Sequence, residues 1–204
     1  MYIPKDNQFT ENEQIIEFLG QNAFGLLVST VQGQLWATHI PLEFDINEQG
    51  QQVVFGHVAR ANPQWRDLAD GSEVMAVFSG PHAYVSSSWY DHINVPTWNY
   101  IAVHVYGRYR QIEGDELLNS LTRLTNKYEA GSTKPVKVEE FSEAFMKSHL
   151  RALVGFEIEI TDIQAKKKLS QNRDNTNQGN IIAELDKRGD SQSVAVAEAM
   201  KELR

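Results

Sequence analysis

The chain has 204 residues, of which 41% are hydrophobic and 23% charged, a balance typical of one globular domain with at most a short appendage. It contains no cysteine, which excludes disulfides, thiolate metal sites and cysteine nucleophiles and is consistent with a reducing compartment. The net charge of −8 disfavours attraction of the whole surface to nucleic acid or anionic lipid. No apolar run approaches the ~20 residues of a membrane helix, and residues 1–10 do not read as a signal peptide. We therefore expect a cytoplasmic protein.

The N-terminal two thirds of the chain reads mainly as strands. Thr10 and Glu13 have the spacing of a capping box, and the apolar stripe after them predicts a helix over about 11–21. Turn signals stand at 31–34 and 47–51. The predicted strands cover residues 24–30, 34–44, 52–58, 73–79, 97–107 and 154–161. Strands this closely spaced indicate an antiparallel barrel or sandwich.

Helical patterns interrupt and follow the strands. Helices are predicted over 115–129 and 138–150. Residues 170–180 are polar and read as a loop, and short helices are expected over 181–188 and 193–203. These last two helices carry too few large apolar residues for a core of their own, so they must pack on the barrel or on a partner chain.

A candidate anion site follows the third predicted strand. Asn62 suits an N-cap and Pro63 suits the first turn of a short helix over about 63–68. Free amides at a helix start, with Arg60 and His57 nearby in sequence, would suit a phosphate. The alternative is an ordinary capped helix beside a surface arginine, and spacing alone leaves both possibilities open.

Aromatic residues gather in the middle of the sequence. Aromatic rings beside the hydroxyls of Ser86–Ser88 could hold a planar ring with polar edges, such as a flavin. Core or interface packing explains the same pattern equally well. The cluster comprises Tyr84, Trp89, Tyr90, Trp98, Tyr100, Tyr106 and Tyr109.

The six histidines show no pair at the spacing of metal ligands, so no metal site is predicted. No catalytic residue can be assigned, because neither a serine-hydrolase motif nor a nucleotide-binding glycine motif is present. Residues 166–173 carry four positive charges and could contact phosphate. Together with Lys187, Arg188, Lys201 and Arg204, this run is the only candidate patch for DNA, and a solvated charged surface is the usual explanation for such a run.

Several of these segments together resemble the PaiB family of bacterial FMN-binding negative transcriptional regulators. The resemblance extends from residue 1 to about residue 203, with its motifs in the same order. Its more specific motifs are Pro96-Thr97-Trp98-Asn99-Tyr100 and Lys168-Leu169-Ser170-Gln171-Asn172-Arg173, supported by residues 1–4, 37–42, 56–57, 62–65 and 88–90.

The resemblance implies a fold of mainly β structure with peripheral helices, a split Greek-key β-barrel of the FMN-binding type. It implies a homodimer with FMN in a cleft between the subunits. We expect an FMN-binding domain over 1–165 and an appended loop with short helices over 166–204.

The resemblance also implies roles for particular residues. Arg60 and Asn62 would hold the FMN phosphate, with His57 at the same end. Thr38 and His39 would lie beside the ring or ribityl chain. Trp98, Asn99 and Tyr100 would approach from the second subunit, and Lys168, Ser170 and Gln171 would close the cleft.

Three functions compete. The first is an FMN-binding transcriptional regulator, and the second is an FMN-dependent oxidoreductase of the pyridoxamine phosphate oxidase or flavin reductase type. The third is a haem-binding split barrel with His39, His57 or His149 as the axial ligand.

Overall fold

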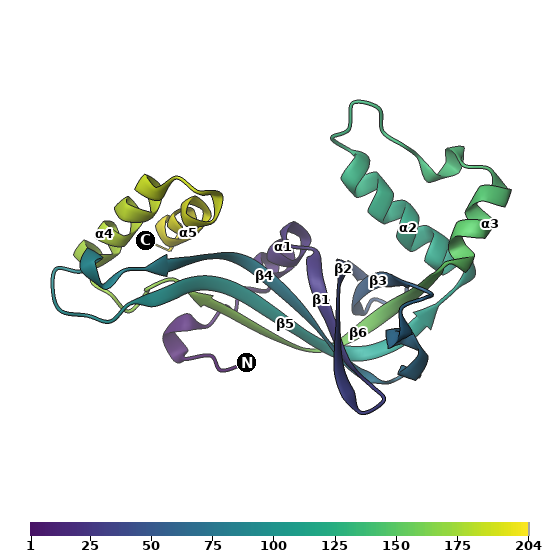
Figure 1. The fold of residues 1–204 in the computed structure, drawn as a ribbon, viewed down its shortest axis with the longest axis horizontal. Helices are drawn as coiled ribbons and strands as arrows, with labels where there is room; N and C mark the ends of the chain where they lie inside the picture. The colour runs from purple at the N-terminus through teal and green to yellow at the C-terminus, as the bar shows by residue number, and fades with distance from the viewer. Residues whose placement is uncertain (204) are drawn as a thin grey trace. The chain divides into compact units, whose positions relative to one another are not determined.

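The computed structural model describes residues 1–203 as a six-stranded closed antiparallel barrel with peripheral helices (Figure 1). The strands follow the order β1-β2-β3-β6-β5-β4 around the barrel. Their bounds are β1 Phe24–Val31, β2 Gln34–Ile46, β3 Gln52–Ala59, β4 Glu73–Val85, β5 Thr97–Ile112 and β6 Leu153–Lys168. The predicted mainly β fold with peripheral helices is confirmed.

The first hairpin forms where the turn signal predicts it. Val31 of β1 faces Gln34 of β2, which leaves Gln32 and Gly33 as a two-residue loop. Both have positive φ angles, 50° and 77°. This is the backbone of a type I′ turn, which suits the right-handed twist of paired strands. The hairpin thereby fixes which face of β2 each following side chain occupies.

Three strands are longer than the sequence pattern predicts. β4 continues to Val85, β5 to Ile112 and β6 to Lys168. In β4 and β5, buried residues still alternate with more exposed ones over these extensions. The extensions contain Gly, Pro, Arg and Lys residues that weaken a strand signal in sequence, and pairing with neighbouring strands overrides that weak propensity.

The helices are α1 Asn12–Gln21, α2 Gly114–Glu129, α3 Glu143–Arg151, α4 Asn175–Arg188 and α5 Ser191–Lys201. The helix expected over 138–150 is interrupted. A short 3₁₀ turn, η4 Val138–Glu140, is followed by a new start at Ser142, whose hydroxyl accepts from the Phe145 amide. The expected loop over 170–180 is also wrong in its second half, because Asp174 caps α4 by accepting from the Asn177 amide.

Contacts divide the described chain into two units, and each is built from separate segments. The barrel unit contains residues 19–77 and 105–163, and the second unit contains residues 1–18, 78–104 and 164–204. Strands β4, β5 and β6 contribute residues to both units. The boundary expected near residue 165 stays a prediction.

The barrel unit has an inner core and an outer apolar layer. Inside, Leu42, Val54 and Phe156 are fully buried, and Gly56 makes room for the Phe156 ring, since a Cβ there would lie 2.5 Å from it. On the other face of β3, Val53 and Phe55 pack with Ile112 and Leu117 and with partly buried Leu121 and Leu150. This outer layer attaches α2 and α3 to the barrel.

The second unit is built around α4 and α5, which pack against each other (Figure 1). Ile181 and Leu185 of α4 and Val196 of α5 are fully buried. Gly189, with a φ of 71°, ends α4, and Asp190 caps α5. The expectation that these helices pack on the barrel or on a partner chain stays a prediction.

Candidate functional site

The start of the short helix η2 Pro63–Asp67 is joined to β2 by a polar cluster. Asn62 caps η2 as predicted, its side-chain oxygen accepting from the Gln64 amide at 3.0 Å. Its amide nitrogen donates to Thr38 Oγ1 at 2.9 Å, and that hydroxyl donates to Gln64 Oε1 at 2.6 Å. The structure therefore brings together two of the predicted ligand residues, Thr38 and Asn62.

Gln64 is the residue of this cluster that sequence reasoning missed. It is fully buried, and its Nε2 donates to the Leu27 carbonyl at 3.2 Å and to Ser29 Oγ at 3.0 Å. The sequence offers one signal for this residue, which is its place between a proline and a tryptophan in the first turn of a capped helix. The sequence does not show that its buried partners lie on β1. Gln64 positions Thr38 and anchors η2 to the barrel.

Arg60 lies at the end of β3 with its guanidinium held in place. Its Nε donates to the Arg151 carbonyl at 2.7 Å and its Nη2 to the Leu153 carbonyl at 2.8 Å. The group also lies 5.5 Å from the Trp65 ring, whose indole nitrogen donates back to the Arg60 carbonyl at 3.1 Å. Arg60 is nevertheless exposed, so a solvent-facing cation is oriented by fixed backbone acceptors.

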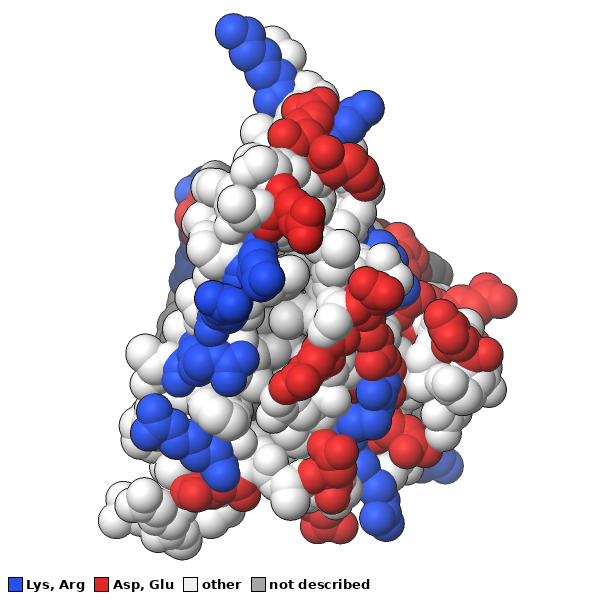
Figure 2. Space-filling view, turned by 90° about the vertical axis from the view of Figure 1, so that its right-hand side faces the viewer, with Lys and Arg blue, Asp and Glu red and all other residues white. Residues whose placement is uncertain are grey.

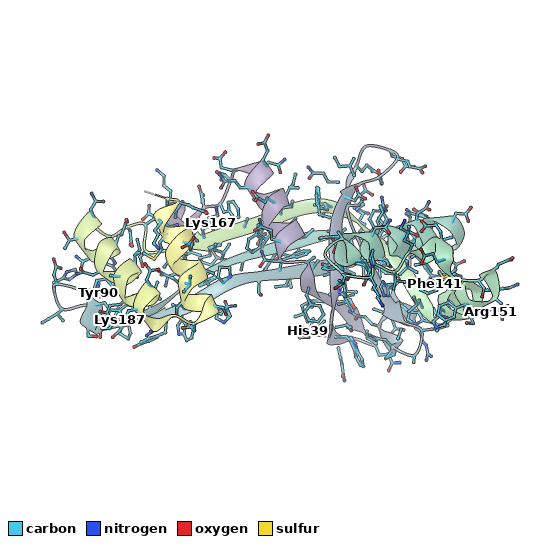
Figure 3. The ribbon with its side chains drawn as sticks, turned by 90° about the horizontal axis from the view of Figure 1, so that it is seen from above. His39, Tyr90, Phe141, Arg151, Lys167 and Lys187 are labelled. Atoms are coloured by element: carbon cyan, nitrogen blue, oxygen red, sulfur yellow. The ribbon has the colours of Figure 1, made fainter. Side chains whose placement is uncertain are left out.

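His39 and His57 occupy different surroundings. His39 is exposed on β2, where its ring stacks beside Phe24 at 6.2 Å (Figure 3). It alternates with Thr38 along the strand, so the two side chains point to opposite faces. His57 is partly buried on β3, and this burial lowers its pKa below the usual value. A lowered pKa favours the neutral imidazole, which is a poor partner for a phosphate dianion.

The other predicted ligand residues lie in the second unit, in two environments. Trp98 is 53% exposed, with Tyr84 edge-on to its ring at 6.0 Å and His82 at 6.2 Å. Tyr100 lies partly buried beneath Lys166, whose Nζ is 5.3 Å from the ring. Trp98 thus offers an aromatic surface to a ligand, whereas the face of Tyr100 is already covered.

Asn99, Ser170 and Gln171 are occupied by internal hydrogen bonds. Asn99 is fully buried and accepts from Ser170 Oγ at 3.1 Å. Ser170 has a φ of 61°, a strained conformation for serine that this bond helps to hold. Gln171 donates to the Lys167 carbonyl at 2.6 Å and accepts from the Leu169 amide at 2.7 Å. These residues shape the turn that joins β6 to α4.

The basic run over 166–173 is engaged within its own unit. Lys166 Nζ donates to the Tyr2 carbonyl at 3.1 Å. Lys167, labelled in Figure 3, donates through Nζ to Gln14 at 3.1 Å and lies beside the Phe9 ring. Lys168 Nζ donates to the Trp98 carbonyl at 2.8 Å and to Thr97. Burial lowers the pKa of Lys167 and of Lys168. The run is therefore not the freely solvated patch that its sequence suggests, and Arg204, the last member of the wider patch, lies outside the described residues.

The aromatic cluster read from the sequence does not form one face. Tyr109 is buried in the barrel unit, stacked on Phe156 at 5.6 Å, and Tyr90 is also buried. In the second unit, Arg188 lies 4.5 Å from the Trp89 ring and donates to the Tyr84 carbonyl at 2.8 Å. Core packing therefore explains Tyr109 and Tyr90, whereas a role of the exposed Trp98 in holding a planar ring stays a prediction.

Comparison with known proteins identifies the family. Residues 1–162 match the family model described as "Putative FMN-binding domain". The chain belongs to this family. It is also 44% identical over 202 residues to "Protease synthase and sporulation protein PAI 2" of Bacillus subtilis, covering 99% of this chain and 97% of that protein. The predicted membership of the PaiB family is confirmed, and with it membership of a flavin-binding family.

Solved structures confirm the split-barrel fold. The FAD and haem binding protein of Mycobacterium smegmatis aligns with a TM-score of 0.58 at 18% identity, over 79% of this chain and 73% of its own. A flavocytochrome from Azotobacter vinelandii aligns with a TM-score of 0.57 at 15% identity, over 78% and 68%. Within residues 1–203, no helix has the length and apolar character needed to cross a membrane.

The donor groups around η2 fit a phosphate ester. Arginine has five N–H donors, and the two hydrogen bonds to carbonyls leave three of them on Arg60. Asn62 uses one of its two amide hydrogens on Thr38. A cation whose remaining donors are pre-oriented is the usual way in which proteins hold a phosphate. The chemistry of this donor set is therefore compatible with the phosphate of a flavin mononucleotide.

Proposed function

We propose that this protein is an FMN-binding transcriptional regulator of the PaiB type. The observation that carries the proposal is the near full-length identity of 44% to a protein named for protease synthesis and sporulation, within a family described by FMN binding. The family match favours this function over the oxidoreductase and haem alternatives. FMN, when bound, supplies one- and two-electron redox chemistry, and the chain supplies its orientation.

The phosphate end of the proposed site is built on η2. Arg60 is its cation, and the side-chain amide of Asn62 is its neutral donor; the start of η2 adds none, because Pro63 has no N–H and the Gln64 amide donates to Asn62. Thr38 is a positioning residue here, because its hydroxyl holds both Asn62 and the buried Gln64. The side chain of His39 points to the opposite face of β2 from that of Thr38. We therefore propose that His39 contacts the flavin ring or the ribityl chain and not the phosphate.

The aromatic wall of the site is proposed to come from a second copy of the chain. Trp98 carries the largest exposed aromatic surface among the expected ligand residues and belongs to the second unit. The hydrogen bonds of three further expected residues are internal, so these residues would shape the turn between β6 and α4 and would not contact the ligand themselves. They are Asn99, Ser170 and Gln171. Lys168 holds the backbone at Trp98 and so positions that ring. The homodimer is thus part of the proposed site.

A flavin titration tests cofactor binding. The purified full chain is titrated with FMN while the ~450 nm absorbance band and flavin fluorescence are followed, with FAD and hemin in parallel. We expect saturable FMN binding at one site per subunit and at least tenfold weaker binding of FAD, because Arg60 suits a terminal phosphate monoester. Preference for FAD, or a Soret shift with hemin and none of the flavin changes, would contradict the assignment.

DNA binding tests the regulatory half of the proposal separately. Lys166, Lys167 and Lys168 are held by internal hydrogen bonds. Within the candidate patch, Lys187 of α4 offers a cation to DNA, because 77% of its side chain is exposed beside Glu184 (Figure 3). The test is retention of promoter fragments at graded salt, with and without FMN. Specific retention that survives physiological salt supports a repressor, and its absence even at low salt excludes one while leaving FMN binding intact.

A further inference from the structure

A cavity of about 490 Å³ in the barrel unit lies between α2 and α3. Its walls come from the start of α2, one side of α3, the end of β5 and the start of β6. A cavity of this size suits a small molecule. The lining residues of α3 have the spacing of a single helical face. They are Glu143, Met146, Lys147, Leu150 and Arg151.

The floor of this cavity is apolar and only partly covered. Ile112, Leu117 and Val154 are buried beneath it, and the first two belong to the outer apolar layer of the barrel. Further apolar side chains of the lining are only half-buried, so the chain leaves apolar surface open at this point. The half-buried members are Leu118, Met146, Leu150 and Leu153. Apolar surface left open in a concave site favours a ligand with an aliphatic part.

Three cations line the same cavity, and they are Arg60, Lys147 and Arg151. All three are exposed, and none of them forms an ion pair with any of residues 1–203. Arg151, labelled in Figure 3, is the last residue of α3, and its carbonyl accepts from Arg60 Nε. The Arg60 guanidinium therefore lies at the C-terminal end of α3. The three positive charges remain available to an anion.

Charge on this side of the molecule is divided. Figure 2 looks onto the side on which α2 and α3 lie in Figure 1, and it shows basic side chains in a column with acidic side chains mainly to one side. The cavity itself also contains Glu113 and Glu143, and Glu113 already accepts from Gln111 Nε2 at 2.7 Å. Three cations against two carboxylates leave one positive charge in the lining. This balance suits a singly charged anion better than a phosphate dianion.

We propose that this cavity binds a medium-chain aliphatic carboxylate, with the tail on the apolar floor and the carboxylate at Lys147 and Arg151. A few charged groups beside an apolar surface are the usual way in which a site fixes the orientation of such a ligand. Arg60 is also the cation proposed for the flavin phosphate, so the carboxylate is assigned to the two cations that the flavin proposal does not use. The proposal goes beyond the function proposed above, and its test does not depend on FMN binding.

The test is calorimetric titration of the full-length protein with sodium octanoate. Two probes each remove one part of the ligand, because 1-octanol keeps the tail without the charge and butyrate keeps the charge with a shorter tail. We expect saturable binding of octanoate and at least tenfold weaker binding of both probes, since burial of methylene groups and contact with the cations both contribute. Absence of saturable octanoate binding, or equal affinity for octanoate and either probe, would overturn the proposal.

Two double variants locate the carboxylate. Lys147→Gln/Arg151→Gln changes two exposed side chains and should weaken octanoate binding at least tenfold. Lys134→Gln/Lys137→Gln is the matched control, because it removes two exposed lysines between α2 and α3 that lie outside the lining, and it should leave octanoate affinity unchanged. Equal losses in the two variants would mean that general charge attracts octanoate, which would overturn the proposal.

FMN titration of the same variants separates this site from the flavin site. Both variants should bind FMN as tightly as the natural chain, because none of the four residues is assigned to the flavin. Loss of FMN binding together with octanoate binding in Lys147→Gln/Arg151→Gln would assign these cations to the flavin and overturn the proposal of a separate site. Loss of octanoate binding with FMN affinity retained supports it, whatever the fate of the flavin assignment.

Discussion

Arg60 has two roles in the folded chain, and a mutation has to separate them. Its guanidinium fixes the turn between α3 and β6 through two carbonyls, and its remaining donors face solvent. The first role depends on contacts about ninety residues away, which no local spacing in the sequence reveals. The second role was predicted from the capped helix and from family resemblance, as was the cap at Asn62, which the structure confirms.

Arg60→Ala should weaken FMN binding by about 1.5–3 kcal/mol, the range of a hydrogen bond to a charged group. The measurement is FMN titration, with the thermal midpoint recorded to detect loosening of the α3–β6 turn. Arg66→Ala is the matched control, because Arg66 is an exposed arginine of η2 that also lies near the Trp65 ring, at 5.9 Å. Equal losses in the two variants would mean that general charge, not the Arg60 position, attracts the phosphate.

Two histidines give the stability a pH dependence with a defined sign. Burial lowers the pKa of His57, and burial with the charge of the N-terminus lowers that of His104. The unfolded chain, in which these histidines have their usual pKa near 6.5, therefore binds protons more readily than the folded chain. The free energy that the neutral histidines contribute to folding is fully present above pH 6.5 and is lost as the pH falls from there through their lower pKa values in the folded chain.

Urea unfolding at pH 7.5, 6.5 and 5.5 measures this dependence. The free energy of unfolding should decrease toward pH 5.5 in the natural chain. The decrease should be smaller in the double variant His57→Gln/His104→Gln, which cannot be protonated at these positions. An identical decrease in both proteins would assign the pH dependence to other groups.

At the scale of elements, local signals predicted most of the structure. The positions of β1, β2, β3 and α2 agree with the sequence patterns to within one or two residues, because alternation and helical periodicity are strong there. Strand pairing extends β4, β5 and β6 beyond their sequence patterns, and the errors among the helices occur where a cap outweighs composition. Ser142 restarts a helix inside a continuous pattern, and Asp174 starts α4 within a segment of Asn and Gln residues.

Glycine substitutions test the β1–β2 turn. Gly33→Ala should lower the free energy of unfolding by about 1 kcal/mol, because a Cβ at a φ of 77° is strained even though nothing lies within 4 Å of it. Gly179→Ala, in the interior of α4 with similar space around it, should raise stability by about 0.5–1 kcal/mol. Urea unfolding of both variants measures the two changes in the free energy of unfolding, which should have opposite signs. A decrease in both variants would mean that turn geometry is not the cause.

At the scale of the whole molecule, family resemblance predicted the barrel and the flavin-binding family. Spacing could not predict which motif residues are structural. Asn99 and Gln171 lie in the most specific motifs, yet their polar groups are satisfied within the chain. A motif residue that holds a turn and one that touches a ligand look alike in sequence, because both require a fixed polar side chain.

Mixing of variants tests the proposed shared site. Arg60→Ala and Trp98→Ala homodimers should each bind FMN weakly. When the two are unfolded, mixed and refolded together, a heterodimer contains one site with both natural residues, so about a quarter of all sites should regain full affinity if subunits assort randomly. Light scattering checks that the dimer forms, and no recovery in the mixture would place Arg60 and Trp98 in separate sites or in one subunit.

The two units interleave along the chain, each assembled from segments that the other interrupts. A single cut in the gene therefore cannot release either unit whole, and a fragment ending within β4, β5 or β6 would leave strand edges without their neighbours. Nicking of an exposed loop, such as the one between α2 and η4, would give two polypeptides that both still contribute to the barrel. Such a nicked protein should stay associated under native conditions and separate only in denaturant.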